Sequence, residues 1–220
     1  MGDPTAAISD VRAAILHYGR RMVAEHLVIG SAGNISVRLG DMVAMTPSGV
    51  EYDQLGEANV CVLDAEGNLV EGDGARSSEW PMHRRIYDRT DARAIVHTHS
   101  PFAVAVSTVC DELPAIHYSI LRLGGPTVRV APYTTFGSDG LAEAAVMALE
   151  DRAAALLQNH GAVAYGSSLD DAYNRALLLE WLVEVYWRAR LVGSPRILDS
   201  AELDEVRQAA RRHRYQAGGA

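Results

Sequence analysis

Short apolar segments of four to six residues recur along this chain and alternate with longer segments of helical periodicity. Strands are expected at residues 35–39, 42–46, 60–64, 68–71, 94–99, 127–131, 154–157 and 162–165. Glycine-containing turns at 40–41 and 65–67 make the first four strands into two hairpins. Hairpins mixed with helices predict an α/β layered fold around a largely antiparallel sheet.

The expected helices separate these strands. They cover residues 8–27, residues from 77 or 78 to 87, a segment that begins at Pro101, and residues 139–149, 169–192 and 201–214. Ser77 or Ser78 is the predicted cap of the second helix, with Glu79 in its first turn. Helix 169–192 is apolar on most sides, which predicts burial or a subunit contact. No linker rich in Pro or Gly divides the 220 residues, so a single domain over 1–220 is expected.

All 20 basic residues are arginine, and the chain contains no lysine. A Schiff base with a carbonyl substrate or with pyridoxal phosphate is therefore excluded. The lysine of a P-loop or of a protein kinase is also missing. The net charge of −8, spread along the chain, argues against a nucleic-acid partner.

Targeting signals are not apparent in the sequence. The first residues have neither a basic nor an apolar stretch, so no signal peptide is expected. The uncharged runs 94–110 and 153–169 both contain histidine, so neither predicts a membrane span. Cys61 and Cys110 are too few for a disulfide framework or a CxxC metal site. A cytoplasmic protein with no membrane partner is the expectation.

Two histidines two residues apart end a predicted strand. Residues spaced by two project from the same face, so His97 and His99 can converge on one metal ion. His160 lies in a short loop between two apolar strands, where it could supply a third ligand. Three imidazoles form an open, catalytic type of zinc site. The HExxH motif is absent, which excludes a metalloprotease of the zincin class. The nearest carboxylate that could join the three histidines is Glu79.

The alternative interpretation is that these are core histidines with ordinary hydrogen bonds, and for His97 and His99 the residues alone leave both interpretations open. The other histidines are predicted to have no metal role: His17, His26, His83, His117 and His213.

Three small, hydroxyl-containing segments could bind a phosphate. Residues 31–34, 46–49 and 77–78 can each present backbone N–H groups and hydroxyls to an anion without any lysine. The alternative is that each segment is only a turn.

Several motifs occur together in one order along nearly the whole chain. They are Gly33-Asn34-Ile35-Ser36, Thr46-Pro47-Ser48-Gly49, Ser77-Ser78-Glu79-Trp80, His97-Thr98-His99, Pro114-Ala115-Ile116-His117-Tyr118, residues 131–137 and Gln158-Asn159-His160-Gly161. In these motifs the chain resembles the class II, zinc-dependent sugar-phosphate aldolases. The resemblance implies a three-layer α/β/α domain and a homotetramer with active sites at subunit interfaces.

The resemblance also implies roles for individual residues. One zinc ion per subunit would be held by His97, His99, His160 and, in the empty site, Glu79, which would act as acid/base once substrate binds. The phosphate would be bound at Asn34, Ser48, Gly49, Ser77 and Ser78. Tyr118 would reach the active site of a neighbouring subunit as an acid, Tyr215 would be a second mobile tyrosine, and Phe136 would line the aldehyde pocket.

The implied reaction is cleavage of a phosphorylated ketose, L-fuculose 1-phosphate or a close analogue, to dihydroxyacetone phosphate and an aldehyde such as L-lactaldehyde. Breaking a C–C bond beside a ketone leaves an enediolate that needs an electron sink. A chain without lysine must use a Lewis acid, and zinc can supply it. Glu79 then needs a raised pKa to exchange a proton; partial burial would raise this pKa, while the nearby zinc would oppose the rise.

Other outcomes stay open at this stage. His97-Thr98-His99-Ser100 also occurs in sugar-phosphate 4-epimerases of the same fold, whereas Tyr118 favours an aldolase. Arg122, if it faces the pocket, could hold a substrate carboxylate as a decarboxylase would need; facing solvent, it has no bearing on substrate choice. A dehydratase and a non-catalytic interaction module like the adducin head complete the alternatives.

Overall fold

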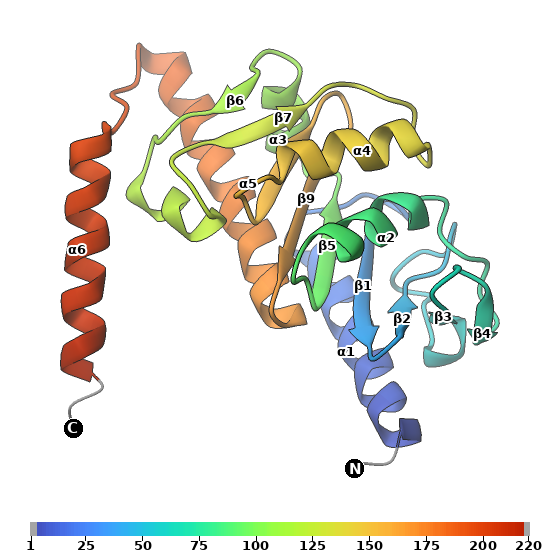
Figure 1. Cartoon of the computed structure of the whole chain (residues 1–220). Coiled ribbons are helices and arrows are strands. Elements are labelled where there is room, and N and C mark those ends of the chain that lie inside the picture. Colours follow the sequence, from blue (N-terminus) through green and yellow to red (C-terminus); the bar gives the residue numbers. More distant parts are fainter. Residues whose placement is uncertain (1–3, 218–220) are drawn as a thin grey trace.

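A central sheet of nine strands organises the molecule (Figure 1). The computed structural model describes residues 4–217, with side chains from residue 8 to 212. The strands are β1 (Asn34–Leu39), β2 (Met42–Met45), β3 (Cys61–Leu63), β4 (Leu69–Glu71), β5 (Ala94–Thr98), β6 (Glu112–Leu113), β7 (Val128–Ala131), β8 (Ala154–Leu157) and β9 (Gly161–Gly166). Their order is β4-β3-β2-β1-β5-β9-β8-β7-β6, and all neighbours are antiparallel except β7 and β8. The sheet is largely antiparallel, as predicted.

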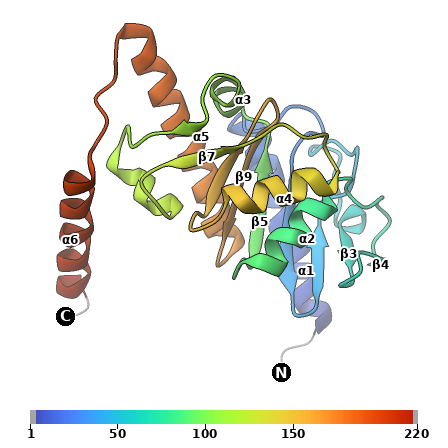
Figure 2. The same ribbon diagram turned by 45° about the horizontal axis from the view of Figure 1, so that its top comes forward.

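Helices cover both faces of the sheet (Figure 2). They are α1 (Pro4–Ala24), α2 (Trp80–Arg89), α3 (Pro101–Ser107), α4 (Asp139–Ala148), α5 (Leu169–Val192) and α6 (Ser200–Ala217), with 3₁₀ turns η1 (Glu57–Asn59) and η2 (Tyr118–Leu123). Helices α1, α3 and α5 pack on one face, and α2 and α4 pack on the other. The chain therefore has the expected three layers.

Burial on both faces explains why the central strands read as continuous apolar runs. Every residue of β5 and of β8 is buried. Strands sandwiched between two helical layers lose the alternation of polar and apolar residues that a solvent-facing sheet shows. His97 and Thr98 end this apolar run in β5, so the polar chemistry begins where the central strand ends.

Several elements differ from the sequence-based expectations. Helix α1 ends at Ala24 rather than 27, and His26 follows it with a φ of 57°, outside the helix. Helix α2 begins at Trp80, so neither Ser77 nor Ser78 caps it; Glu79 holds the N-cap position without a side-chain cap bond. Pro81 explains the shift, because a residue without an N–H belongs in the first turn. Strand β6 and both 3₁₀ turns were not predicted.

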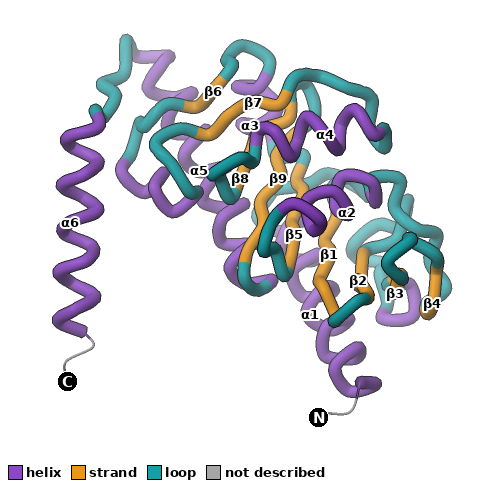
Figure 3. Tube along the Cα trace, viewed as in Figure 1, coloured by secondary structure: helices purple, strands orange, loops and turns teal. Residues whose placement is uncertain are grey.

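Helix α5 buries one face only. Its buried residues recur at helical spacing from Leu169 to Tyr186, whereas Trp181 is 44% exposed. Beyond α5 a loop leads to α6, which stands apart from the sheet beside η2, with Leu203 buried (Figure 3). Within residues 4–217, none of the helices is long and apolar enough to cross a membrane.

Candidate metal centre

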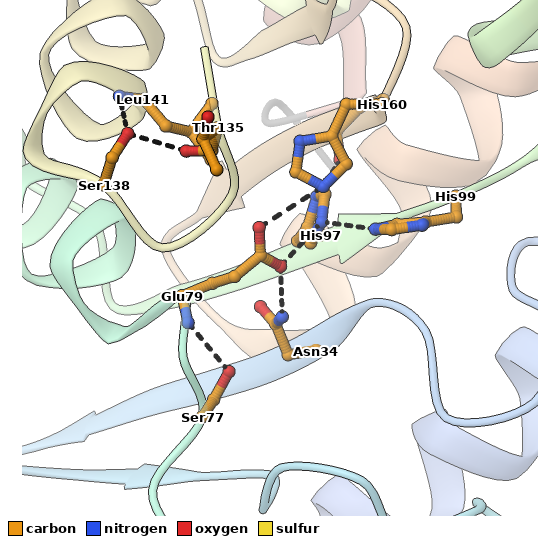
Figure 4. A network of polar contacts seen from close by, with 10 residues as sticks. Asn34, Ser77, Glu79, His97, His99, Thr135, Ser138, Leu141 and His160 are labelled. Atoms are coloured by element: carbon orange, nitrogen blue, oxygen red, sulfur yellow. Dashed lines mark hydrogen bonds and ion pairs between the residues drawn. The ribbon is translucent and has the colours of Figure 1, made fainter.

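Four potential metal ligands meet at one end of the central strands (Figure 4). His97 is the penultimate residue of β5, and His99 lies one residue beyond the end of that strand. His160 comes from the β8–β9 loop, and Glu79 directly precedes α2. One nitrogen or oxygen from each of the four lies within 4.8 Å of the others. The fold therefore brings together residues up to 81 positions apart in the sequence.

Hydrogen bonds and contacts set the geometry of the cluster. His97 Nε2 lies 2.9 Å from His99 Nε2 and 3.0 Å from Glu79 Oε2, and His160 Nε2 lies 3.3 Å from Glu79 Oε1. The three imidazole centroids are 4.7–4.8 Å apart. The predicted projection of His97 and His99 from one face is thus what the strand produces.

Backbone geometry aims the rings inward. His97 is fully buried, and its Nδ1 lies 2.8 Å from the carbonyl oxygen of Ala162. A ring that donates from Nδ1 keeps the lone pair of Nε2 free for a metal ion. His160 follows Asn159, whose φ of 56° turns the chain sharply between β8 and β9.

The residues fit a divalent metal ion. The Nε2 atoms of His97 and His99 lie 2.9 Å apart and point at the same space. Two nitrogen lone pairs at this separation repel each other unless a proton or a metal cation lies between them. Glu79 Oε1 is buried and makes no hydrogen bond. Three imidazoles and one carboxylate are the donor set of a zinc site in which the carboxylate can give way to substrate.

Charge coupling dominates the titration of the cluster. Burial alone would raise the pKa of Glu79, but His97 and His160 hold that pKa far below its usual range. Burial alone would lower the pKa of His97, but the Glu79 carboxylate raises it above its usual value. Burial lowers the pKa of His99 to about 3 and that of His160 to about 4. Without metal, the carboxylate of Glu79 and the imidazole of His97 each favour the charged form of the other.

This result modifies one expectation. Burial was expected to raise the pKa of Glu79 against the opposing effect of zinc, whereas in this arrangement the neighbouring imidazoles already outweigh burial and lower that pKa. Glu79 can therefore accept a proton readily only after it separates from His97.

A cavity of about 390 Å³ opens beside the four ligands. Its wall includes every residue that the resemblance assigned to phosphate or aldehyde binding: Asn34, Ser48, Gly49, Ser77, Ser78 and Phe136. Tyr133, Thr134 and Asn159 also line it and were not singled out as site residues, although they belong to the quoted motifs 131–137 and 158–161. Their membership in those motifs was the sequence signal that could have identified them as site residues.

The segments around the cavity are turns. Ser77 Oγ accepts a 3.2 Å hydrogen bond from the Glu79 N–H, which fixes the turn before α2. Asn34 begins β1 and donates from Nδ2 to Glu79 Oε2 at 2.8 Å, so its amide already contacts the ligand carboxylate.

Tyr118 and Arg122 lie away from the cavity beside the histidines. Tyr118 is in η2, half-exposed, and lines a separate cavity of about 470 Å³ between η2 and α6, together with Arg122. Arg122 is exposed and does not line the cavity beside the histidines. Tyr215 belongs to α6, and its side chain falls outside the described residues.

Comparison with known proteins identifies the family to which this chain belongs. Residues 13–187 match the family described as the class II aldolase and adducin N-terminal domain. The chain belongs to this family. It is 38% identical over 198 residues to the 5-deoxy-D-ribulose 1-phosphate aldolase of Bacillus thuringiensis serovar kurstaki, covering 89% of this chain and 92% of the relative. With the L-fuculose phosphate aldolase of Escherichia coli strain K12 it shares 40% identity over 167 residues, 76% of this chain and 77% of the relative.

Solved structures agree. A structure described as L-fuculose 1-phosphate aldolase superposes with a TM-score of 0.86 at 36% identity, covering 92% of this chain and 96% of the other. The chain is thus an enzyme of the class II aldolase type, and the non-catalytic adducin-like alternative loses its support.

Proposed function

We propose that this class II aldolase cleaves a deoxyketose 1-phosphate to dihydroxyacetone phosphate and a short aldehyde in a zinc-dependent reaction. The proposal rests on one observation. Four potential metal ligands, Glu79, His97, His99 and His160, converge beside a cavity whose wall includes turns of the kind that can bind phosphate. A divalent ion bound there would polarise the substrate carbonyl and offset the negative charge that develops when the C–C bond breaks.

The polar turns would bind the phosphate. Ser48, Gly49, Ser77 and Ser78 line the cavity and offer hydroxyls and backbone N–H groups, which hold a phosphate without a cationic side chain. The ketose 1-phosphate would then lie with its carbonyl end toward the histidines.

Glu79 would transfer the proton at the carbon that becomes the end of dihydroxyacetone phosphate. Its carboxylate lies among the histidines, and displacement by the substrate's oxygens would separate it from His97 and let its pKa rise.

Tyr118 would come from a second copy of the chain. Tyr118 lines a different cavity from the one beside the histidines, so an interfacial site would bring this acid to the metal centre of a neighbouring copy. The half-exposed Trp181 and Trp187 on α5 suit the homotetramer that we infer for the active enzyme. Tyr215 on α6 stays a proposal as the second mobile tyrosine that the resemblance implies.

The relatives guide the choice of substrate. Their names specify 5-deoxy-D-ribulose 1-phosphate, 5-methylthioribulose 1-phosphate and L-fuculose phosphate. 5-Deoxyribulose 1-phosphate and L-fuculose 1-phosphate carry a methyl group at the end away from the phosphate. Phe136 and Tyr133, both exposed at the cavity, would provide an apolar surface for such a group.

The decisive experiment is a substrate panel on metal-free and zinc-loaded protein. L-Fuculose 1-phosphate, 5-deoxyribulose 1-phosphate and ribulose 5-phosphate are each incubated after chelator treatment and again after zinc is added, with product analysis. We expect dihydroxyacetone phosphate from at least one deoxyketose 1-phosphate, only with metal. Cleavage that persists in chelator would refute the zinc mechanism, and an epimerised or dehydrated product would identify an alternative reaction.

A further inference from the structure

Helix α3 connects the two segments that carry His99 and His160. It begins at Pro101, two residues after His99, and ends at Ser107. At its far end, Ser107 Oγ accepts a 3.2 Å hydrogen bond from the backbone N–H of Asn159, the residue before His160. The helix therefore touches one ligand-bearing segment at each end.

The contact at Ser107 is buried and specific. Ser107 is fully buried, and its hydroxyl donates to the Val104 carbonyl at 2.8 Å, which leaves its lone pairs directed to Asn159. Asn159 has a left-handed φ of 56°, a conformation that asparagine adopts more readily than most residues with a Cβ, and it makes a sharp turn directly before His160. The Ser107 hydroxyl holds the turn that delivers His160.

The other end of α3 is held by a carboxylate from α5. Glu180 accepts three hydrogen bonds: from Ser100 Oγ at 2.7 Å, from the Phe102 N–H at 2.9 Å and from the Ala103 N–H at 2.9 Å. Burial raises the pKa of Glu180, and these hydrogen bonds oppose that rise. A carboxylate kept at this depth fixes the backbone directly after His99.

These backbone contacts matter because, in the part of the chain that the structure describes, the polar contacts of the His99 and His160 rings are to His97 and Glu79 of the same cluster. Among the described residues, only His97 of the three has a hydrogen bond from its ring to the backbone, at Ala162. The ring directions of His99 and His160 therefore follow from where their main chains lie.

We propose that Ser107 and Glu180 are positioning residues that hold His160 and His99, through α3, at the spacing required by the metal ion. This inference rests on the metal site of the proposed function. Partners of this kind outside the ligand set tune metal affinity by about 10–100-fold.

Paired variants test the proposal. Ser107→Ala removes one oxygen, and its matched control is Thr108→Ala, because the exposed Thr108 hydroxyl also donates to a backbone carbonyl, that of Ala105, in the same helix end. Glu180→Gln keeps the shape of the side chain, and its control is Glu184→Gln, one turn further along α5, where Glu184 pairs with the exposed Arg188.

The readout is the affinity of each metal-free protein for Zn²⁺, measured by competition with a chromophoric chelator, alongside thermal unfolding of the metal-free form. We expect Ser107→Ala and Glu180→Gln each to weaken zinc binding by about 10-fold or more, with both controls within twofold of the parent. A merely structural role would lower the unfolding temperature and leave zinc affinity unchanged.

The outcomes separate the two proposals. If the parent protein binds no zinc, the proposed function fails and takes this inference with it. If the parent binds zinc and both variants bind it as tightly as their controls, the positioning role is overturned while the metal site stands. Should one variant not fold, as judged by circular dichroism, the other pair decides.

Discussion

Asn34 and His97 face each other across β1 and β5 and reach the same oxygen of Glu79. Asn34 Nδ2 donates to Glu79 Oε2 at 2.8 Å, and His97 Nε2 lies 3.0 Å from that oxygen. The strand register sets the separation of the two side chains. The sheet itself thus aims an amide and an imidazole at one carboxylate.

Replacement of Asn34 tests this arrangement. In Asn34→Ala, Glu79 loses a hydrogen bond that favours its ionised form, so its pKa should rise and the carboxylate should be less well oriented. We expect kcat/KM to fall about 10-fold or more, with a shifted acidic limb in the pH profile. Asn68→Ala, which removes an exposed amide bonded to Asp64, is the control. Equal profiles for the two variants would contradict the role of Asn34.

Removal of one imidazole should weaken metal binding. His97→Ala removes one of the four ligands, the one whose ring orientation is fixed by the Ala162 carbonyl, so metal content and cleavage should fall together. His17→Ala on α1 serves as the control because His17 lies outside the cluster. Elemental analysis of the purified variants measures the effect; full metal content in His97→Ala would disprove its assignment as a ligand.

Zinc binding near pH 6 should release about one proton. The carboxylate of Glu79 raises the pKa of His97 above that of an ordinary histidine, so at this pH the imidazole holds a proton that it must lose to become a ligand. His99 and His160, with pKa values of about 3 and 4, are already neutral.

The pH dependence of affinity has a definite sign. As pH falls below the raised pKa of His97, apparent zinc affinity should fall by about 10-fold per pH unit. Calorimetry in two buffers of different ionisation enthalpy counts the protons. A thousandfold loss per unit would mean that all three imidazoles titrate, and a flat profile would mean that none does.

Tyr118 should act across a subunit boundary. Tyr118→Phe should keep its metal and slow cleavage by about 10²–10⁴-fold, as for loss of a general acid. In mixed oligomers of Tyr118→Phe and His97→Ala, a Tyr118→Phe chain would supply an intact metal centre. A neighbouring His97→Ala chain would supply an intact Tyr118 to the same site. Recovered activity after mixing supports the shared site, and unchanged turnover of Tyr118→Phe alone removes this residue from the mechanism.

Local patterns in the sequence were informative where backbone geometry alone controls the outcome. Strand periodicity put His97 and His99 on one face, and their rings do meet. The first residue of α2 was harder to predict from the sequence. Pro81 belongs in the first turn, so the helix begins at Trp80, after the two serines that were expected to cap it. The parallel pairing of β7 with β8 depends on how distant segments pack, and no local signal encodes it.

The sequence by itself determined the donor types, the lack of an amine nucleophile and the alternation of strands and helices, because residue identity and local periodicity fix these. Only the tertiary structure decided that Glu79 and His160 meet His97, and that the pKa of Glu79 is lowered rather than raised. Tertiary packing likewise carried Tyr118 away from the histidines of its own chain. The physical reason is that charge coupling and burial depend on distances through space, which spacing along the chain does not set.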